Sequence, residues 1–233
     1  MPRAKPTTRL RPTAKAPPEP PDTTRARILE AAGNVFADHG FREATVRSIC
    51  MCAGVNVAAI NYHFRSKEAL HEACMLEAHR YSADRYPVNA GLPPVPTPRH
   101  RLTAFVRAFV LKVMDQDRPS WHGRLMAREM IDPSPALAIV IEHEIRPNFE
   151  YLMATLTELE PRLSVLQRRM AAASVVGQCL HYFWCKEVVL RLGEVPPADD
   201  DWAETLSNHI VNFTLGGLPA IAKPTANPVA KHP

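Results

Sequence analysis

The stretch TVRSICMCAGVNVAAINYHFRSKEAL, which runs from Thr45 to Leu70, decides the fold. Thr45 is a good N-cap because its hydroxyl can accept hydrogen bonds from the amides that follow it. Gly54 then interrupts the helical pattern, and Asn56 can cap a second short helix expected over residues 57–64. Two short helices joined by a glycine-containing turn are typical of a helix-turn-helix.

Longer helical patterns lie on both sides of this segment. Apolar residues recur at helical spacing from residues 22–24 to about residue 39, and Gly40 is expected to end that helix. On the other side, Ser66 can cap a helix over residues 67–85. These two helices would cover the apolar faces of a helix-turn-helix that is too small to stand alone.

The second short helix leaves an unusual set of side chains outside once Ile60 and Phe64 point inward. Its first residues are small, so the helix could enter the major groove of DNA, which is about 12 Å wide. Hydroxyl, amide and imidazole groups follow, and basic residues flank them. We therefore expect contacts with duplex DNA from Thr45, Arg47, Asn56, Val57, Ala58, Ala59, Asn61, Tyr62, His63 and Lys67.

Each of these residues also has a structural alternative. Thr45 can act only as a helix cap, Tyr62 can simply pack, and His63 can cap a neighbouring element. Positive charge gathers at one end of the chain: residues 1–22 hold five basic and two acidic residues and residues 23–67 hold six basic and three acidic ones, and on charge alone a solvated surface is the equal alternative to a DNA-binding one. Each segment thus carries +3 of a total formal charge of +4, which suits a polyanionic partner.

Other classes of protein fit the sequence poorly. No apolar run approaches the roughly 20 residues that cross a bilayer, and the N-terminus lacks the apolar centre of a secretory signal. A cytoplasmic location without membrane contact is therefore expected. The five cysteines are an odd number, which argues against a disulfide framework, and their spacing predicts no metal site. No catalytic or cofactor-binding motif occurs, so we expect neither an enzyme nor a cofactor.

The rest of the chain predicts an all-α protein, because no alternating β pattern occurs. Helices are expected over residues 101–114, 123–130, 135–159 (with a kink or break near Arg146, before Pro147), 164–192 and 202–215. The domains would be a disordered basic, proline-rich arm (1–22), the helix-turn-helix domain with its connecting helix (23–85), a linker with five prolines (86–98), a larger helical domain (99–222) and a flexible tail (223–233).

The stretch quoted above closely resembles the DNA-binding region of TetR/AcrR-type bacterial regulators. The shared features are the threonine-capped helix, the Ala-Gly-Val turn, the Tyr-x-Phe near the end of the next helix and the lysine that opens the following one. Farther along, GLPP (91–94), AREMIDPSPAL (127–137) and SVVGQCLHY (174–182) resemble the C-terminal domain of the CerR branch, which includes CecR-like repressors. Cys50 and Cys52 depart from the family pattern and leave a redox role open.

The resemblance implies a homodimer that binds a near-palindromic operator and is released by a small hydrophobic effector. Residues 164–192 are apolar on more than one face, as a helix covered from two sides would be. The interface is expected at Val176, Gly177, Leu180, Phe183, Trp184 and Phe213. Candidate effector-pocket residues, with core packing as the alternative, are Phe105, Phe109, Met126, Met130, Phe149, Met153, His181 and Tyr182. An activator, or an architectural DNA binder without an inducer, remains the alternative function.

Overall fold

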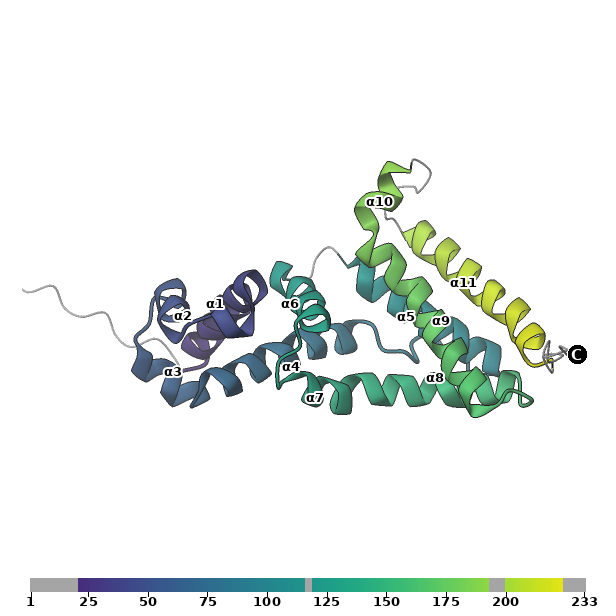
Figure 1. Ribbon diagram of the computed structural model, residues 1–233, viewed down its shortest axis with the longest axis horizontal. Coiled ribbons are helices and arrows are strands. Elements are labelled where there is room, and N and C mark those ends of the chain that lie inside the picture. Colours follow the sequence, from purple (N-terminus) through teal and green to yellow (C-terminus); the bar gives the residue numbers. More distant parts are fainter. Residues whose placement is uncertain (1–20, 116–118, 193–199, 224–233) are drawn as a thin grey trace, which may run out of the picture.

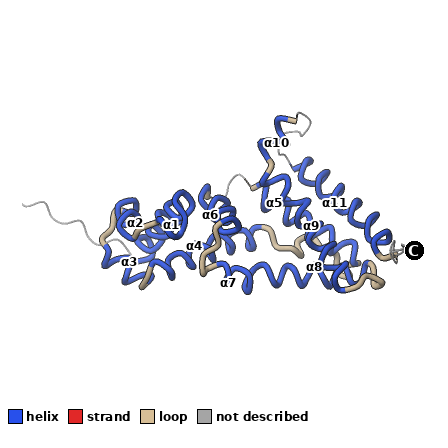
Figure 2. Tube along the Cα trace, in the orientation of Figure 1, coloured by secondary structure: helices blue, strands red, loops and turns tan. Residues whose placement is uncertain are grey.

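The structure is a computed structural model that describes residues 21–115, 119–192 and 200–223. These residues form helices joined by short loops, and no strand occurs among them (Figures 1 and 2). The molecule is elongated, with α1–α4 at one end, α5 and α8–α11 at the other, and α6 and α7 between them (Figure 1). The prediction of an all-α fold is confirmed. None of the described helices is long and apolar enough to span a membrane.

The helix-turn-helix and α4 have the bounds that the sequence predicts, whereas the helix before them extends past its expected end at residue 39. These helices are α1 (Pro21–Glu43), α2 (Val46–Ala53), α3 (Val57–Phe64) and α4 (Lys67–Arg85). Three side chains cap the last three helices by accepting an amide hydrogen bond: Thr45 from Ser48, Asn56 from Ala59, and Ser66 from Ala69. Because each such cap contributes about 1 kcal/mol, the short helices α2 and α3 gain stability from their own sequence.

Gly40 breaks α1 rather than ending it. Its backbone has φ 81° and ψ 165°, and the chain then makes one more turn to Glu43. A positive φ favours glycine, and space does so too, because a Cβ on Gly40 would lie 2.7 Å from Nε of Arg128. The expected helix end at residue 39 is therefore a kink at which α1 meets another helix.

The second half of the chain is also helical. Its elements are α5 (Pro98–Met114), α6 (Ser120–Ile131), α7 (Leu137–Val140), the π-helical turn η1 (Ile141–Ile145), α8 (Arg146–Leu159), α9 (Val165–Trp184), α10 (Lys186–Arg191) and α11 (Asp200–Ile221). The π turn ends two residues before Pro147, which lacks a backbone donor, and this irregularity falls at the expected kink near Arg146.

One helix boundary differs from the sequence prediction. We expected a single helix over residues 164–192, but α9 ends at Trp184 and α10 starts after Cys185. From there α10 projects away from the body of the molecule (Figure 1). The prediction was wrong because no glycine or proline marks the break and the apolar pattern continues across it.

The buried apolar residues form two clusters. The first cluster joins α1–α4 with Trp121, Leu125, Ala136 and Val140. The second cluster joins α5, α8, α9 and α11. By its packing, α6 therefore belongs with the helix-turn-helix, although the linker separates the two in the chain. The chain then passes from α6 through α7 and η1 to α8, which packs in the second cluster.

Candidate nucleic-acid interface

The outer face of α3 carries the side chains expected there. Ile60 and Phe64 are buried in the first cluster, at 0% and 5% exposure. Four residues of the same helix are exposed: Val57, Ala58, Asn61 and Tyr62. Tyr62 is 81% exposed, so its ring and hydroxyl are available to a partner rather than used in the core. The face is narrow and mixes small residues with hydrogen-bonding groups, which suits entry into a groove.

Two further residues of α3 lie at the edge of this face. Ala59 is half-buried and packs against the first cluster. His63 is also half-buried, and its ring meets the ring of Tyr62 edge to face at a centroid distance of 5.0 Å. This ring contact favours one orientation of the exposed Tyr62 side chain.

The N-terminal end of α2 presents a hydroxyl and a guanidinium. Thr45 Oγ1 accepts from the amide of Ser48 at 3.0 Å, and the Ser48 hydroxyl lies 3.2 Å from the Thr45 amide, which donates to it. This is a capping box, so the structural alternative for Thr45 is realised. Thr45 and Arg47 are both exposed, and both stay accessible beside the positive end of a helix.

Lys67 has acceptors within the chain. Its Nζ donates to the carbonyls of Phe41 at 2.8 Å and of Ala44 at 2.9 Å, and it lies 4.5 Å from the centroid of the Phe41 ring. These carbonyls belong to the last turn of α1 and the loop to α2, where a helix leaves acceptors unpaired. Lys67 thus ties the start of α4 to the α1–α2 junction and fixes how α2 and α3 sit on α1.

Arg65 was not among the expected DNA contacts, yet it directly follows the exposed face of α3. It has φ 67° and ψ −47°, and Ser66 N donates to Phe64 O at 2.8 Å across it, which is a γ-turn of the strained, positive-φ type. The side chain is exposed directly after α3. The available signal was the two-residue connection between two capped helices, which contains no glycine. A strained non-glycine residue beside a candidate interface points to function.

The seam between α1 and α6 holds the helix-turn-helix against the rest of the chain. The indole of Trp121 lies over Gly33, where a Cβ would come within 2.4 Å of it. Its N–H donates to Glu30 Oε2 at 2.7 Å. One turn further along α6, Arg124 forms an ion pair with Asp38. These contacts fix α6 on α1 by shape and by charge.

A buried polar group joins α4 to the loop after α6. Glu129 Oε1 accepts from the hydroxyl of Ser134 at 2.8 Å and from its amide at 2.7 Å. His71 Nδ1 lies 3.3 Å from the Ser134 hydroxyl, while His71 Nε2 is 3.9 Å from Glu129. Burial, with a smaller contribution from Lys67, lowers the pKa of His71 to about 4. His71 is therefore neutral at pH 7 and serves as a hydrogen-bonding partner.

The residues expected to line an effector pocket do not all lie together. Phe105 is buried in the second cluster, and Phe109, Phe149, Met153 and Tyr182 pack against it. Met126 instead packs against the first cluster, while Met130 and His181 are exposed. Five of the eight candidates thus share one region between α5, α8 and α9.

The end formed by α9 and α11 exposes an apolar stripe. Leu166, Met170 and Trp184 on α9 are 67%, 61% and 46% exposed, and Phe213 on α11 is 66% exposed. Gly177 lies between them and has open space where a Cβ would be. Of the expected interface residues, Gly177, Trp184 and Phe213 are exposed, whereas Val176, Leu180 and Phe183 are half-buried.

The cysteines of the described residues lie apart from any possible metal cluster. Within the described residues, no group of three or more His, Cys, Asp or Glu side chains could hold a metal ion. Cys50 is buried in the first cluster and Cys52 is exposed on α2.

Comparison with known protein families matches both halves of the chain. Residues 28–74 match the family described as bacterial regulatory proteins, tetR family. Residues 98–218, more than half of the chain, match the C-terminal domain of the HTH-type transcriptional dual regulator CecR.

Individual relatives agree with these matches. The chain is 28% identical to the dual regulator CecR of Shigella flexneri over 217 residues, which cover 84% of this chain and 93% of CecR. It is 36% identical to the regulator UidR of Escherichia coli K12 over 63 residues, 27% of this chain and 32% of UidR. The chain thus spans about a third of the length of UidR.

Solved structures share the fold at low sequence identity. A protein of Pseudomonas aeruginosa PAO1, described as a transcriptional regulator, superposes with a TM-score of 0.64 at 22% identity over 87% of this chain and 95% of its own. AibR, solved in complex with isovaleryl coenzyme A and operator DNA, gives a TM-score of 0.59 at 16% identity over 82% and 97%.

Proposed function

Because this chain belongs to the TetR family of bacterial transcriptional regulators, with a C-terminal domain of the CecR type, we propose that it is a cytoplasmic repressor released from DNA by a small hydrophobic effector. It is not an enzyme. The observation that carries the proposal is the exposed face of α3, small at its start and hydrogen-bonding at its end, on a helix whose other face is buried.

In this proposal α3 lies in the major groove and the neighbouring groups hold the phosphates. The amide of Asn61 can donate to and accept from one base edge, the pattern that reads adenine. Arg47 and Arg65 stand on either side of α3 and would meet the backbone of the duplex. The proposed DNA contacts are Thr45, Arg47, Asn56, Val57, Ala58, Ala59, Asn61, Tyr62, His63 and Arg65, while Lys67 acts by positioning α2 and α3 on α1.

A homodimer would present two such helices to one operator. The exposed stripe of Leu166, Met170, Trp184 and Phe213 is too apolar to be left in water, and Gly177 permits close approach of a second helix. Pairing of α9 and α11 with the same helices of a second copy would bury it as a four-helix bundle. The two copies of α3 would then read half-sites about one helical turn, ~34 Å, apart.

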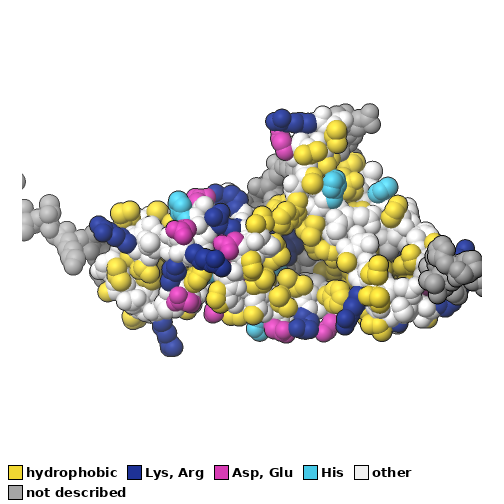
Figure 3. Space-filling view, in the orientation of Figure 1, with side chains coloured by type: hydrophobic (Ala, Val, Ile, Leu, Met, Phe, Trp, Pro, Cys, Tyr) yellow, Lys and Arg dark blue, Asp and Glu magenta, His cyan; other side chains and the backbone are white. Residues whose placement is uncertain are grey.

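Effector binding would act through α6. A ligand seated against Phe105, Phe149 and Tyr182 would lie in the second cluster, and the surface is hollowed between that end and α6, where hydrophobic side chains concentrate (Figure 3). Since α6 packs on α1, a shift of α6 would turn the helix-turn-helix. Release requires the ligand to prefer the released state, typically by ~1–3 kcal/mol. AibR, which shares the fold, was solved in complex with isovaleryl coenzyme A and operator DNA, so this fold can hold a small molecule and an operator.

An activating role is the second candidate. The relative that aligns over most of the chain, CecR of Shigella flexneri, is described as a dual regulator. Binding to the operator would be the same in both cases, and the position of the operator relative to the promoter would decide the outcome.

Selection of bound duplexes from random sequence, followed by footprinting, tests the proposal. We expect enrichment of a near-palindrome, and we expect Asn61→Ala to change the selected bases. Arg47→Ala should reduce the slope of log K against log salt by about 0.9, the contribution of one phosphate contact. Arg107→Ala, an exposed arginine on α5, is the matched control and should leave the slope unchanged.

Lys67→Met separates positioning from contact. Because its ammonium is bonded to carbonyls, the variant should lower thermal stability while the salt slope of the folded protein stays near that of the native chain. If no duplex is enriched and binding does not depend on salt, the proposal is wrong.

A further inference from the structure

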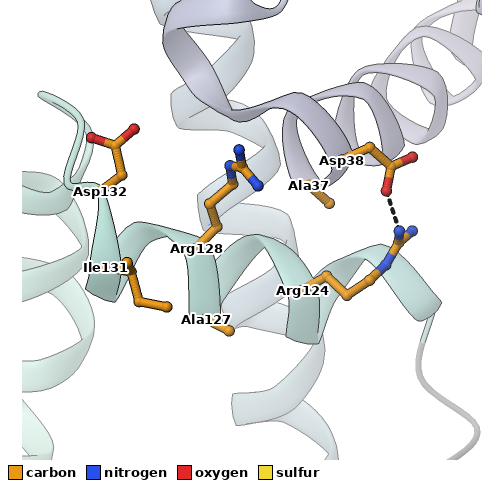
Figure 4. Close-up of a pocket in the computed structure, with 7 residues that line it drawn as sticks. All are labelled: Ala37, Asp38, Arg124, Ala127, Arg128, Ile131 and Asp132. Carbon is orange, nitrogen blue, oxygen red and sulfur yellow. Dashed lines mark hydrogen bonds and ion pairs between the residues drawn. The ribbon is translucent and has the colours of Figure 1, made fainter.

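A cleft of about 500 Å³ lies between α1 and α6 (Figure 4). Pockets that bind small molecules measure roughly 300–1,000 Å³, so this volume falls in their range. Ala37 on α1 and Ala127 and Ile131 on α6 supply its apolar part. Ile131 is 74% exposed, so the cleft carries a large apolar side chain that the chain itself leaves uncovered. This cleft is separate from the second cluster.

Two of the three arginines at the cleft are paired with carboxylates. Arg124 forms an ion pair with Asp38, and Arg42 lies 3.8 Å from Asp132. Arg128 stands between these pairs and extends from α6 toward α1 (Figure 4). In the ranges that the structure describes, its guanidinium has no hydrogen-bond or ion-pair partner, and its Nε is buried.

The backbone is shaped to admit this arginine. Gly40 faces the guanidinium, and a Cβ there would stand 2.7 Å from Nε and 3.3 Å from one terminal nitrogen of Arg128. The carbonyl end of α1 offers a partial negative charge. No described carbonyl accepts a hydrogen bond from Arg128, however, so the charge is only partly compensated. Nε faces Gly40 and is closed to solvent, so an anion would meet the terminal nitrogens of the guanidinium and compensate its charge there.

We propose that the cleft binds a small amphipathic monocarboxylate. The carboxylate would pair with the Arg128 guanidinium, whose fork of donors matches a carboxylate in two parallel hydrogen bonds. The apolar body would lie on Ala37, Ala127 and Ile131 and cover surface that is now in water. The acids on both sides, Asp38 and Asp132, disfavour a dianion such as phosphate or a dicarboxylate.

Such a ligand would touch both helices of the seam at once. It would then act on the junction between the helix-turn-helix and the rest of the chain, at a site distinct from an effector bound in the second cluster. This consequence for DNA binding rests on the proposed function, whereas binding itself does not.

The test measures binding of 4-fluorobenzoate to the full-length protein by ¹⁹F NMR, with 4-fluorobenzamide as the uncharged analogue. We expect millimolar or tighter binding of the acid and none of the amide. Arg128→Gln should weaken binding about tenfold or more, since hydrogen bonds between charged groups contribute ~1.5–3 kcal/mol. Arg107→Gln, an exposed arginine on α5, should have no effect.

A second variant, Ile131→Glu, keeps the test valid if Arg128→Gln fails to fold. Ile131→Glu changes an exposed position and should abolish binding of the acid by placing a carboxylate at the cleft. Binding that survives both Arg128→Gln and Ile131→Glu, or that is equal for acid and amide, would place the ligand elsewhere and overturn the proposal. So would the absence of binding at millimolar concentrations. No DNA is used, so such a failure leaves the proposed function untouched.

Discussion

The two ends of the molecule differ in how they bury their apolar side chains. At the α1–α4 end, the first cluster is buried with the help of α6, and polar contacts such as Trp121–Glu30 and Lys67–Phe41 hold the elements around it together. At the α9–α11 end, large apolar side chains including Leu166 and Phe213 stay exposed. The contacts that hold the first end together lie within one chain, whereas the exposed stripe of the second end is the surface that the proposed dimer would bury.

The difference separates two kinds of stability. Residues at the first end should affect the unfolding of a single chain, because their partners are in that chain. Exposed residues of the second end should affect self-association far more than unfolding, because their partners would come from another chain. Variants at each end can therefore be sorted by which measurement they change.

The largest effect is expected for Trp121→Ala. The indole is 1% exposed and fills the space over Gly33, so its removal leaves a cavity and deletes the hydrogen bond to Glu30. We expect a loss of about 3–5 kcal/mol in the free energy of unfolding, measured by urea denaturation. Tyr62→Ala, an exposed aromatic residue on α3, should change it by no more than about 0.5 kcal/mol.

The control for Trp121→Ala is its oligomeric state, because Trp121 lies at the first end and not in the proposed interface. Under conditions in which the variant is folded, sedimentation should show the same oligomer as the native chain. A loss of oligomer without loss of unfolding free energy would mean that α6, and not α9 and α11, closes the dimer.

Phe213→Glu should have the next largest effect, and on association only. The side chain is 66% exposed on α11, so the fold of one chain tolerates the change, while a charge in the centre of an apolar interface does not. We expect the dimer dissociation constant to rise at least about 30-fold, or roughly 2 kcal/mol, by analytical ultracentrifugation. Val57→Glu, an exposed apolar residue on α3, is the control at the opposite end. An unchanged dimer would disprove the interface on α11.

Acid should act at the first end, through α4. Burial lowers the pKa of His71 to about 4 and that of His79 to about 3, below the ordinary value of 6.5. On acidification the unfolded chain takes up these protons first, so the stability is complete above pH 6.5 and is lost as the pH falls toward 4. The slope for each histidine is at most about 1.4 kcal/mol per pH unit.

His71→Gln is the variant that tests this pH dependence. Unfolding free energies at pH 7.5 and 5.5 should differ less in the variant than in the native chain. His209→Gln, on the exposed side of α11, should leave the difference unchanged. If both variants behave as the native chain does, protonation of His71 is not what destabilises the protein in acid.

The sequence predicted the first end well because its signals are local. Thr45, Asn56 and Ser66 cap helices within three residues of themselves, so the bounds of α2, α3 and α4 follow from neighbouring residues. The same holds for the face of α3, since Ile60 and Phe64 are one helical turn apart. Whether that face contacts DNA is a prediction that binding measurements test.

Features that depend on distant partners were not predicted. An apolar stripe shows that α6 is buried but not against what, so Met126 and Met130 were expected in one pocket, whereas one packs on the first cluster and the other is exposed. No glycine or proline lies near Cys185, so the sequence gives no sign of the break between α9 and α10. Arg128 in the cleft is visible only once α6 lies on α1.

The smallest effect on stability is expected for Arg65→Gly, which should stabilise the fold but weaken DNA binding. Its γ-turn holds a non-glycine residue at φ 67°, a strain of order 1–3 kcal/mol that glycine would relieve at some entropic cost. Arg65→Gly should therefore raise the free energy of unfolding by about 1 kcal/mol. It should also weaken DNA binding and lower the salt slope by about 0.9, because a phosphate contact is lost.

Arg65→Ala is the control, because it removes the charge but keeps the strained backbone. It should therefore match Arg65→Gly in DNA binding without the gain in stability. If Arg65→Gly destabilises the protein, the turn is not strained, and if neither variant changes the salt slope, the strained residue at the end of α3 does not touch DNA.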